Sequence, residues 1–147
     1  MYIHDFGIKW LVRDLPEYLT VFDLSKKTQR FGGMTFPLQS GSDKILKAMH
    51  RGHNRTDAIR SLLAVRNYSF DIGTHIMIGF PRETNADFND TLELLKEINF
   101  DFITCFSYSE HPKAQSADIH PKVSQRDVEK RIRKISELFW DRVKVLR

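Results

Sequence analysis

The sequence predicts an α/β protein in which parallel strands alternate with helices. Apolar, branched runs typical of buried strands are separated by stretches whose apolar residues recur at three- and four-residue spacing. Two of the strand runs end in a small polar corner that leads directly into a helix. Single strands alternating with helices favour right-handed crossovers between parallel strands, either in a small open sheet or in part of a (β/α) barrel. The expected strands are residues 2–8, Met34–Leu38, Phe70–Phe80 and Phe102–Tyr108.

The intervening helices follow from apolar spacing and from capping residues. Pro16 must begin or kink a helix because it has no N–H to donate, so the first helical stretch should form two pieces, the second starting at Leu15 or Pro16. Thr56 is the expected N-cap of a later helix, and Ser124-x-x-Asp127 resembles a capping box. The expected helices are Lys9–Lys27, Ser42 to about Met49, Asp57–Arg66, about Asn85 to Ile98, and Ser124 to the C-terminus; the loops include Thr28–Gly33 and Ser109–Val123.

The corner between Phe36 and Asp43 is the most informative stretch. Pro37 marks a strand end, since its missing N–H cannot serve a neighbouring strand, and Ser42 is a good helix N-cap. Corners of this kind lie at the carboxyl ends of parallel strands, where ligands bind. We expect Gln39 and Ser40 to be exposed and to point into such a site; an ordinary βα loop is the alternative.

Composition bounds the class of protein without deciding its function. At 147 residues and 41% hydrophobic, the chain predicts one domain, residues 1–147, with no membrane span. A net charge of +4 tolerates a nucleic-acid partner without requiring one. The single cysteine, Cys105, excludes an internal disulfide, and the first residues lack the pattern of a signal peptide, so a cytoplasmic protein is expected.

Familiar catalytic and metal-binding patterns are missing from the sequence. The six histidines have no metal-ligand spacing, and Cys105 in an apolar strand is better explained as a buried residue than as a nucleophile. No catalytic residue and no metal ligand is therefore predicted. What remains is a concave site at the strand ends lined by Gln39, Ser40, Arg51 and Gly79, with Ser107 beyond.

Three of these residues suit a sugar, an anion and a flat base. Gln39 offers hydrogen bonds of both senses to a hydroxyl, and Arg51 offers a bidentate fork to a carboxylate or phosphate. Gly79 would let a base approach the backbone closely. A separate basic cluster, Lys130, Arg131, Arg133 and Lys134, is either a solvated helix face or a phosphate or RNA contact.

Three motifs together resemble a known family. They are Pro37-Leu38-Gln39-Ser40-Gly41-Ser42-Asp43, then Ile45-Leu46-Lys47-x-Met49-x-Arg51, then Ile78-Gly79-Phe80-Pro81-x-Glu83-Thr84. With the later Asp101, Phe106 and Tyr108-Ser109, this order and spacing resembles the radical S-adenosylmethionine methylthiotransferases that modify tRNA or a ribosomal protein. The resemblance runs from about Phe36 to Ala117.

The resemblance implies a fold and a missing cofactor loop. The family core is a partial (β/α)₆ TIM-type barrel, of which this chain would be roughly the third to sixth βα units: a parallel four-stranded portion with a C-terminal helix. In the family a Cys-x-x-x-Cys-x-x-Cys loop holds a [4Fe–4S] cluster that binds S-adenosylmethionine and generates a radical from it. Cys105 alone cannot replace three thiolates, so the chain alone is expected to be inactive, with S-adenosylmethionine binding weak or lost.

The resemblance also assigns cofactor contacts residue by residue. Gln39 and Ser40 should face the ribose and methionine parts of S-adenosylmethionine, Arg51 its carboxylate, and Ile78 and Gly79 its adenine. The sequence departs from the family pattern at three places. His75 stands where the family usually has an acidic residue, four positions before the glycine. Arg82-Glu83-Thr84 replaces the family's Gly-Glu-Thr, and His111-Pro112-Lys113-Ala114 replaces its Arg-Pro-Gly-Thr.

Two functions remain open at this stage. The chain is expected to be part of a radical S-adenosylmethionine enzyme of the methylthiotransferase type, or else a catalytically dead α/β module that binds a protein or RNA partner. The expected partners are a chain or segment carrying the missing barrel half and, by resemblance, tRNA or a ribosomal protein; no membrane is expected. A second copy could also pair with the edge of the first strand, which would be exposed because the strands that cover it in the family are absent.

Overall fold

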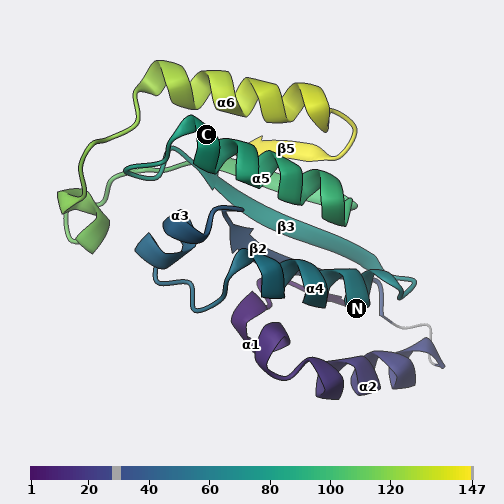
Figure 1. Ribbon diagram of the computed structural model, residues 1–147. Helices are drawn as coiled ribbons and strands as arrows, with labels where there is room; N and C mark the ends of the chain where they lie inside the picture. Colours follow the sequence, from purple (N-terminus) through teal and green to yellow (C-terminus); the bar gives the residue numbers. More distant parts are fainter. Residues whose placement is uncertain (28–30, 147) are drawn as a thin grey trace.

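A computed structural model of the chain describes residues 1–27 and 31–146 (Figure 1). Its strands form one five-stranded sheet in the order β1-β2-β3-β4-β5, and every neighbouring pair is parallel. The strands are β1 (Tyr2–Ile3), β2 (Gly33–Gln39), β3 (Asp71–Ile78), β4 (Phe102–Ser107) and β5 (Val143–Leu146). The helices are α1 (Ile8–Arg13), α2 (Leu15–Lys26), α3 (Asp43–Ala48), α4 (Arg55–Arg66), α5 (Asn85–Ile98), the short 3₁₀ helix η1 (Gln115–Asp118) and α6 (Gln125–Leu138).

The strand order identifies the architecture. Strands that are neighbours in the sequence are neighbours in the sheet, so each right-handed crossover steps the same way and places its helix on the same face. Figure 1 shows α4, α5 and α6 together on that face. A doubly wound sheet would reverse its order at a switch point, whereas a (β/α) barrel does not. The predicted α/β class with a portion of a TIM-type barrel is therefore confirmed.

The core lies between the sheet and these helices. On β3, the side chains of Ile72, Ile76 and Ile78 are fully buried, while the alternating His75 and Met77 are half-buried. The strand is therefore fully buried only on its helix side. The opposite face corresponds to the interior of a barrel.

The C-terminal prediction was wrong in one respect. The predicted last helix ends at Leu138, and Val143–Leu146 forms β5, so the sheet has five strands rather than four. The turn between them is held by Arg142, whose guanidinium donates to the Asn99 side chain at 2.6 Å and to the Phe100 carbonyl. The next segment is thereby directed along β4, where its backbone groups gain parallel-strand hydrogen bonds.

Other boundaries also differ from the sequence prediction. The first strand stops at Ile3, and Asn54 rather than Thr56 is the N-cap of α4, its side chain accepting from the Asp57 N–H. The break at Leu15 is confirmed. The first three residues of the predicted loop Thr28–Gly33 lie outside the described residues. No helix among the described residues is long and apolar enough to cross a membrane.

Asp87 joins the corner after β2 to the start of α5. Its carboxylate accepts hydrogen bonds from the Ser42 hydroxyl at 2.7 Å, from Lys44 Nζ at 2.5 Å and from the Thr84 N–H at 2.8 Å. Burial alone would raise the pKa of Asp87, but the hydrogen bonds from Lys44, Thr84 and Ser42 outweigh it and hold the pKa well below its usual range. The Asp87 carboxylate therefore holds the corner after β2 against the corner that leads from β3 into α5.

Glu83 joins the corner after β3 to α6. Its fully buried Oε2 accepts from the Gly79 N–H at 2.8 Å and from the Arg131 guanidinium at 2.7 Å, and Arg131 itself is 8% exposed. Burial raises the pKa of Glu83, against the opposing effects of Gly79 and Arg131. This pair connects α6 to the end of the central strand.

Replacing Asp87 should destabilise the fold in a pH-dependent way. Asp87→Asn removes hydrogen bonds to a charged acceptor, and we expect a loss of about 1.5–3 kcal/mol at neutral pH. Because the pKa of Asp87 is lowered by folding, its contribution is present above a pH of about 4 and fades at lower pH. Urea unfolding followed by circular dichroism should therefore show a difference from wild type that shrinks on acidification. Asp127→Asn, at the equivalent capping position of α6 but exposed to solvent, is the control and should cost less; equal costs would contradict this account.

The buried pair should show strong coupling between its partners. Arg131→Met leaves Glu83 as an unpaired buried charge, and we expect a loss of about 3–5 kcal/mol. In the double variant Glu83→Gln/Arg131→Met the uncharged amide can still accept from the Gly79 N–H, so most of that loss should be recovered. Chemical denaturation of the single and double variants completes the cycle. Additive losses would show that the two side chains act independently.

Candidate functional site

A cavity of about 460 Å³ opens at the carboxyl ends of β2, β3 and β4. It lies between the strand ends, the turn after α3 and the segment that contains η1. Ligands of parallel α/β proteins bind at this edge. Its lining combines polar, aromatic and sulfur-containing side chains: Gln39, Ala48, Met49, His50, Arg51, Met77, Phe80, Tyr108, Ser109, Gln115, Ser116 and Ile119.

Gln39 reaches the cavity through an irregular strand end. The register between β2 and β3 shifts between Phe36 and Gln39, and Gln39 has a left-handed φ of 74°. Its Oε1 is buried without a hydrogen-bond partner among the described residues. A buried amide oxygen of this kind is costly unless a ligand or water donates to it.

Arg51 enters the same cavity from the turn after α3. His50, with a φ of 53°, reverses the chain, and the Arg51 guanidinium donates to the Pro37 carbonyl at 2.8 Å. Its Nε has no partner in the described part of the chain. Burial lowers the pKa of Arg51, which is the expected effect of desolvating a cation. The anchored guanidinium can therefore neutralise an anionic group of a ligand.

Aromatic side chains form another wall of the cavity. The rings of Phe80 and Tyr108 meet edge to face with centroids 5.4 Å apart, and Met77 lies beside them in the lining. The Tyr108 hydroxyl donates to the Ser116 hydroxyl at 3.0 Å, which holds η1 near the strand ends. An apolar wall facing polar groups is typical of a site for a small molecule with a flat ring.

The other predicted site residues do not line this cavity. The expectation that Ser40 is exposed was wrong: it is fully buried, and its hydroxyl lies 3.4 Å from that of Thr91 on α5. Ile78 is buried in the helix-facing core. Gly79 has a φ of 84°, and a Cβ there would lie 2.5 Å from Val128 of α6, so on that side the glycine is needed for helix packing. The proposed roles of Ile78 and Gly79 beside an adenine stay predictions.

Sequence reasoning missed the residues that complete the site from distant segments. Met77 could have been found, because it alternates with buried Ile76 and Ile78. Gln115, Ser116 and Ile119 could not, since they come from a segment without periodicity that folds back over the strand ends.

The residues of this cavity fit S-adenosylmethionine, but the chain does not fit the [4Fe–4S] cluster that the similar family also uses. An unpaired amide oxygen, a desolvated guanidinium and an aromatic wall fit the sugar, carboxylate and base of S-adenosylmethionine. An iron–sulfur cluster needs several thiolates, whereas Cys105 is buried, its pKa is raised to about 12 by burial, and the described residues contain no cluster of metal-binding side chains. The cluster does not fit this chain.

Comparison with known proteins agrees with the motifs. Residues 15–95, more than half of the chain, match the family model of the radical SAM superfamily, which uses S-adenosylmethionine and a [4Fe–4S] cluster. A tRNA-2-methylthio-N(6)-dimethylallyladenosine synthase from Sulfurihydrogenibium is 31% identical over 88% of this chain and 30% of its own length. A ribosomal protein uS12 methylthiotransferase from Thermosipho melanesiensis is 36% identical over 69% of this chain and 24% of its own. The chain thus spans less than a third of these relatives.

Solved structures agree on the fold. Coproporphyrinogen III oxidase from Escherichia coli, a radical SAM enzyme, superposes with a TM-score of 0.68 over 83% of this chain and 29% of its own, at 19% identity. SuiB from Streptococcus suis, solved with S-adenosylmethionine bound, gives a TM-score of 0.56 over 78% of this chain and 27% of its own, at 11% identity. The chain therefore belongs to the radical SAM superfamily and resembles its methylthiotransferases.

Proposed function

We propose that this chain supplies one wall of the S-adenosylmethionine site in a radical SAM enzyme of the methylthiotransferase type, acting on tRNA or a ribosomal protein. The observation that carries the proposal is the meeting of Gln39 and Arg51 in one cavity with groups left unpaired. These residues come from separate motifs that the resemblance had linked to the same cofactor.

Each group has a defined task in this proposal. The Gln39 amide binds a ribose hydroxyl, and Arg51, held by the Pro37 carbonyl, binds the carboxylate of the methionine part. Phe80 and Tyr108 exclude water from the base. When bound to a reduced cluster, S-adenosylmethionine supplies the radical chemistry of the superfamily.

The thiolates that hold the cluster come, in this proposal, from outside the 147 residues, on a chain or segment that completes the barrel. The chain alone is then inactive. The second candidate, a catalytically dead module that binds a protein or RNA, is favoured by the single buried cysteine. The two candidates differ in whether the cavity still recognises S-adenosylmethionine.

The isolated chain should hold no [4Fe–4S] cluster. A single buried thiol cannot supply the required ligands, so anaerobic reconstitution followed by iron analysis and visible spectroscopy should give no stoichiometric cluster. Cys105→Ser should behave like the wild type. A stoichiometric cluster in the monomer would disprove the claim that its ligands come from elsewhere.

The isolated chain should bind S-adenosylmethionine weakly through Gln39 and Arg51. Without chelation of the methionine end by a cluster, the loss of two or three charged hydrogen bonds at about 1.5–3 kcal/mol each predicts a millimolar or weaker Kd. Ligand-observed NMR at millimolar cofactor is suited to this range. Gln39→Ala and Arg51→Ala should reduce the signal.

Two matched variants control for the loss of side chains. Gln125→Ala removes an amide from α6, and Arg60→Ala removes an exposed guanidinium from α4; neither residue lines the cavity. Both should bind as the wild type does. No binding by the wild-type chain would favour the dead module, and micromolar binding would show that the pocket is complete without the cluster.

A further inference from the structure

A second cavity, of about 260 Å³, lies in the groove between α5 and α6 and is separate from the cofactor cavity. We call it the α5–α6 groove. Its polar lining is dominated by cations and neutral amides, with one aromatic ring in the wall: Asn85, Phe88, Asn89, Asp127, Lys130, Arg131 and Lys134.

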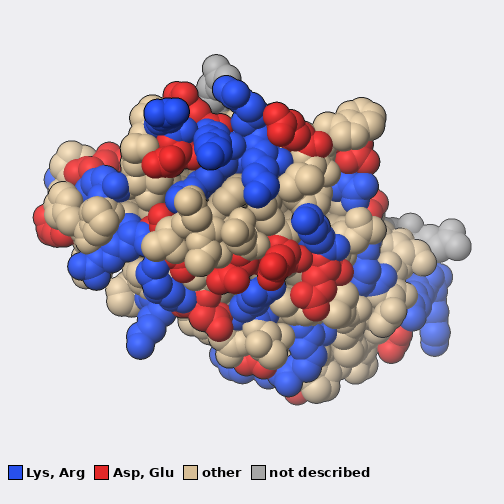
Figure 2. All heavy atoms as spheres, turned by 45° about the horizontal axis from the view of Figure 1, so that its top comes forward, with Lys and Arg blue, Asp and Glu red and all other residues tan. Residues whose placement is uncertain are grey.

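The lysines of this groove are not neutralised. Neither Lys130 nor Lys134 has an ion pair or hydrogen bond within the described residues, and Lys134 Nζ lies 6.0 Å from the Phe88 ring centroid. Arg126 and Arg133 on the same helix also have no ion-pair partner there. Figure 2 shows Lys and Arg side chains gathered over the region of α6. Free cations in a groove attract an anionic partner.

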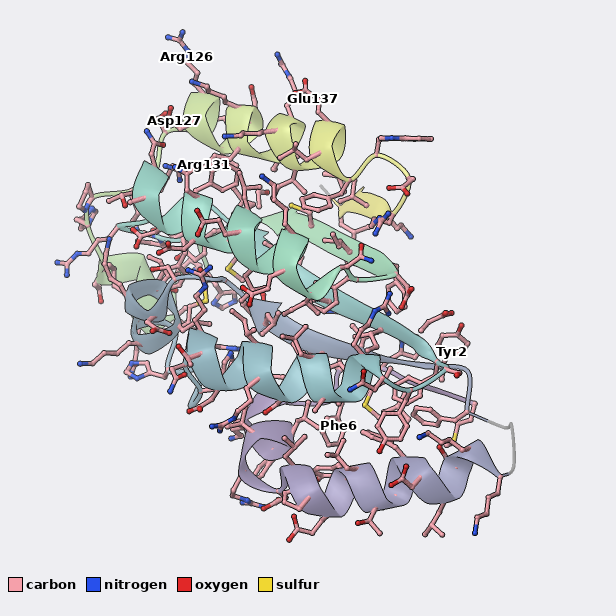
Figure 3. All side chains as sticks on the ribbon, turned by 45° about the vertical axis from the view of Figure 1, so that its right-hand side comes forward. Tyr2, Phe6, Arg126, Asp127, Arg131 and Glu137 are labelled. Atoms are coloured by element: carbon pink, nitrogen blue, oxygen red, sulfur yellow. The ribbon has the colours of Figure 1, made fainter. Side chains whose placement is uncertain are left out.

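The acidic groups nearby do not cancel this charge. Asp127 lines the groove and keeps its negative charge, since among the described residues its carboxylate accepts only from the neutral Ser124 hydroxyl at 2.7 Å; one carboxylate offsets only one of the two lysines. On α5, Asp90 and Glu93 pair with Arg55 of α4, away from α6. Glu137 and Arg126 extend from the outer side of α6, whereas Arg131 lies between α6 and α5 (Figure 3).

We infer that the α5–α6 groove binds the phosphate backbone of an RNA. Lys130 and Lys134 are four residues apart on α6, so they lie side by side along the groove, about 5–6 Å apart at Cβ. Neighbouring cations match a polymer with a charge on every nucleotide better than a peptide with scattered carboxylates. The amides of Asn85 and Asn89 add donors for phosphate and sugar oxygens.

The groove begins at the same edge of the sheet as the cofactor cavity. Helices α5 and α6 each follow a strand, so their first turns lie at the carboxyl ends of β3 and β4. An RNA held along α6 therefore reaches the rim of the cavity. The choice of RNA over other polyanions rests on the proposed function, but binding in the groove needs neither the cofactor nor catalysis.

The salt dependence of RNA binding tests this inference. A fluorescein-labelled RNA stem-loop is titrated with the full chain at several salt concentrations, and the Kd is read from fluorescence anisotropy. The double variant Lys130→Gln/Lys134→Gln should reduce the slope of log K against log salt by about 1.4–1.8, since each phosphate contact contributes about 0.7–0.9. If the variant and the wild type bind equally at roughly 1 M salt, this slope change corresponds to binding about 25- to 60-fold weaker at roughly 0.1 M salt.

A charge-matched control separates the groove from net charge. Lys27→Gln/Lys96→Gln removes the same charge from exposed positions after α2 and near the end of α5, at the opposite edge of the sheet, and should leave the slope unchanged. An equal loss in the control, or no loss in the groove variant, would overturn the inference. Tighter binding of poly-glutamate than of RNA would overturn it in favour of an acidic protein partner. The groove variant should retain the weak S-adenosylmethionine signal, so failure here is distinct from failure of the cofactor proposal.

Discussion

The buried carboxylate of Glu83 fixes the arrangement on which the site depends. It accepts from the N–H of Gly79, which turns the chain out of β3 with a left-handed φ, and from Arg131 in the middle of α6. Desolvating two charges offsets most of their mutual attraction, so the pair contributes more to geometry than to net stability. It places α6 against Gly79, and it fixes the start of the segment from which Phe80 enters the cavity.

Elements that depend on local sequence could be predicted, and those that depend on neighbours could not. The break before Pro16, the strand around Ile76 and the start of α5 at Asn85 follow from local chemistry. The last strand does not follow from it, because Val143 and Leu146 continue the apolar spacing of α6 in the sequence, yet they pair with β4 in the fold. The free edge of β4 offers these residues backbone hydrogen bonds that the sequence pattern does not reveal. Tertiary contacts override the helical pattern there.

The candidate site divides in the same way. Gln39 and Arg51 could be located from the corner and the turn that follow β2, and the structure brings them together. The position of Ser40 could not be inferred, because it depends on Thr91, which is distant in the sequence. The Gly41 N–H also donates to Thr91 at 2.9 Å, so the corner turns its small residues toward α5 and leaves Gln39 to face the cavity.

Arg131 holds the corner after β3 through Glu83, and this pairing limits what Arg131 can do in the α5–α6 groove. It lines the groove, but its guanidinium is already committed to Glu83 and to the Asn85 side chain. If a phosphate recruited Arg131, the buried Glu83 carboxylate would lose its partner at a cost of about 3–5 kcal/mol, more than an exposed phosphate contact returns. A polyanion in the groove must therefore be held by Lys130 and Lys134, whose charges are free of partners among the described residues, while Arg131 keeps the corner after β3 in place.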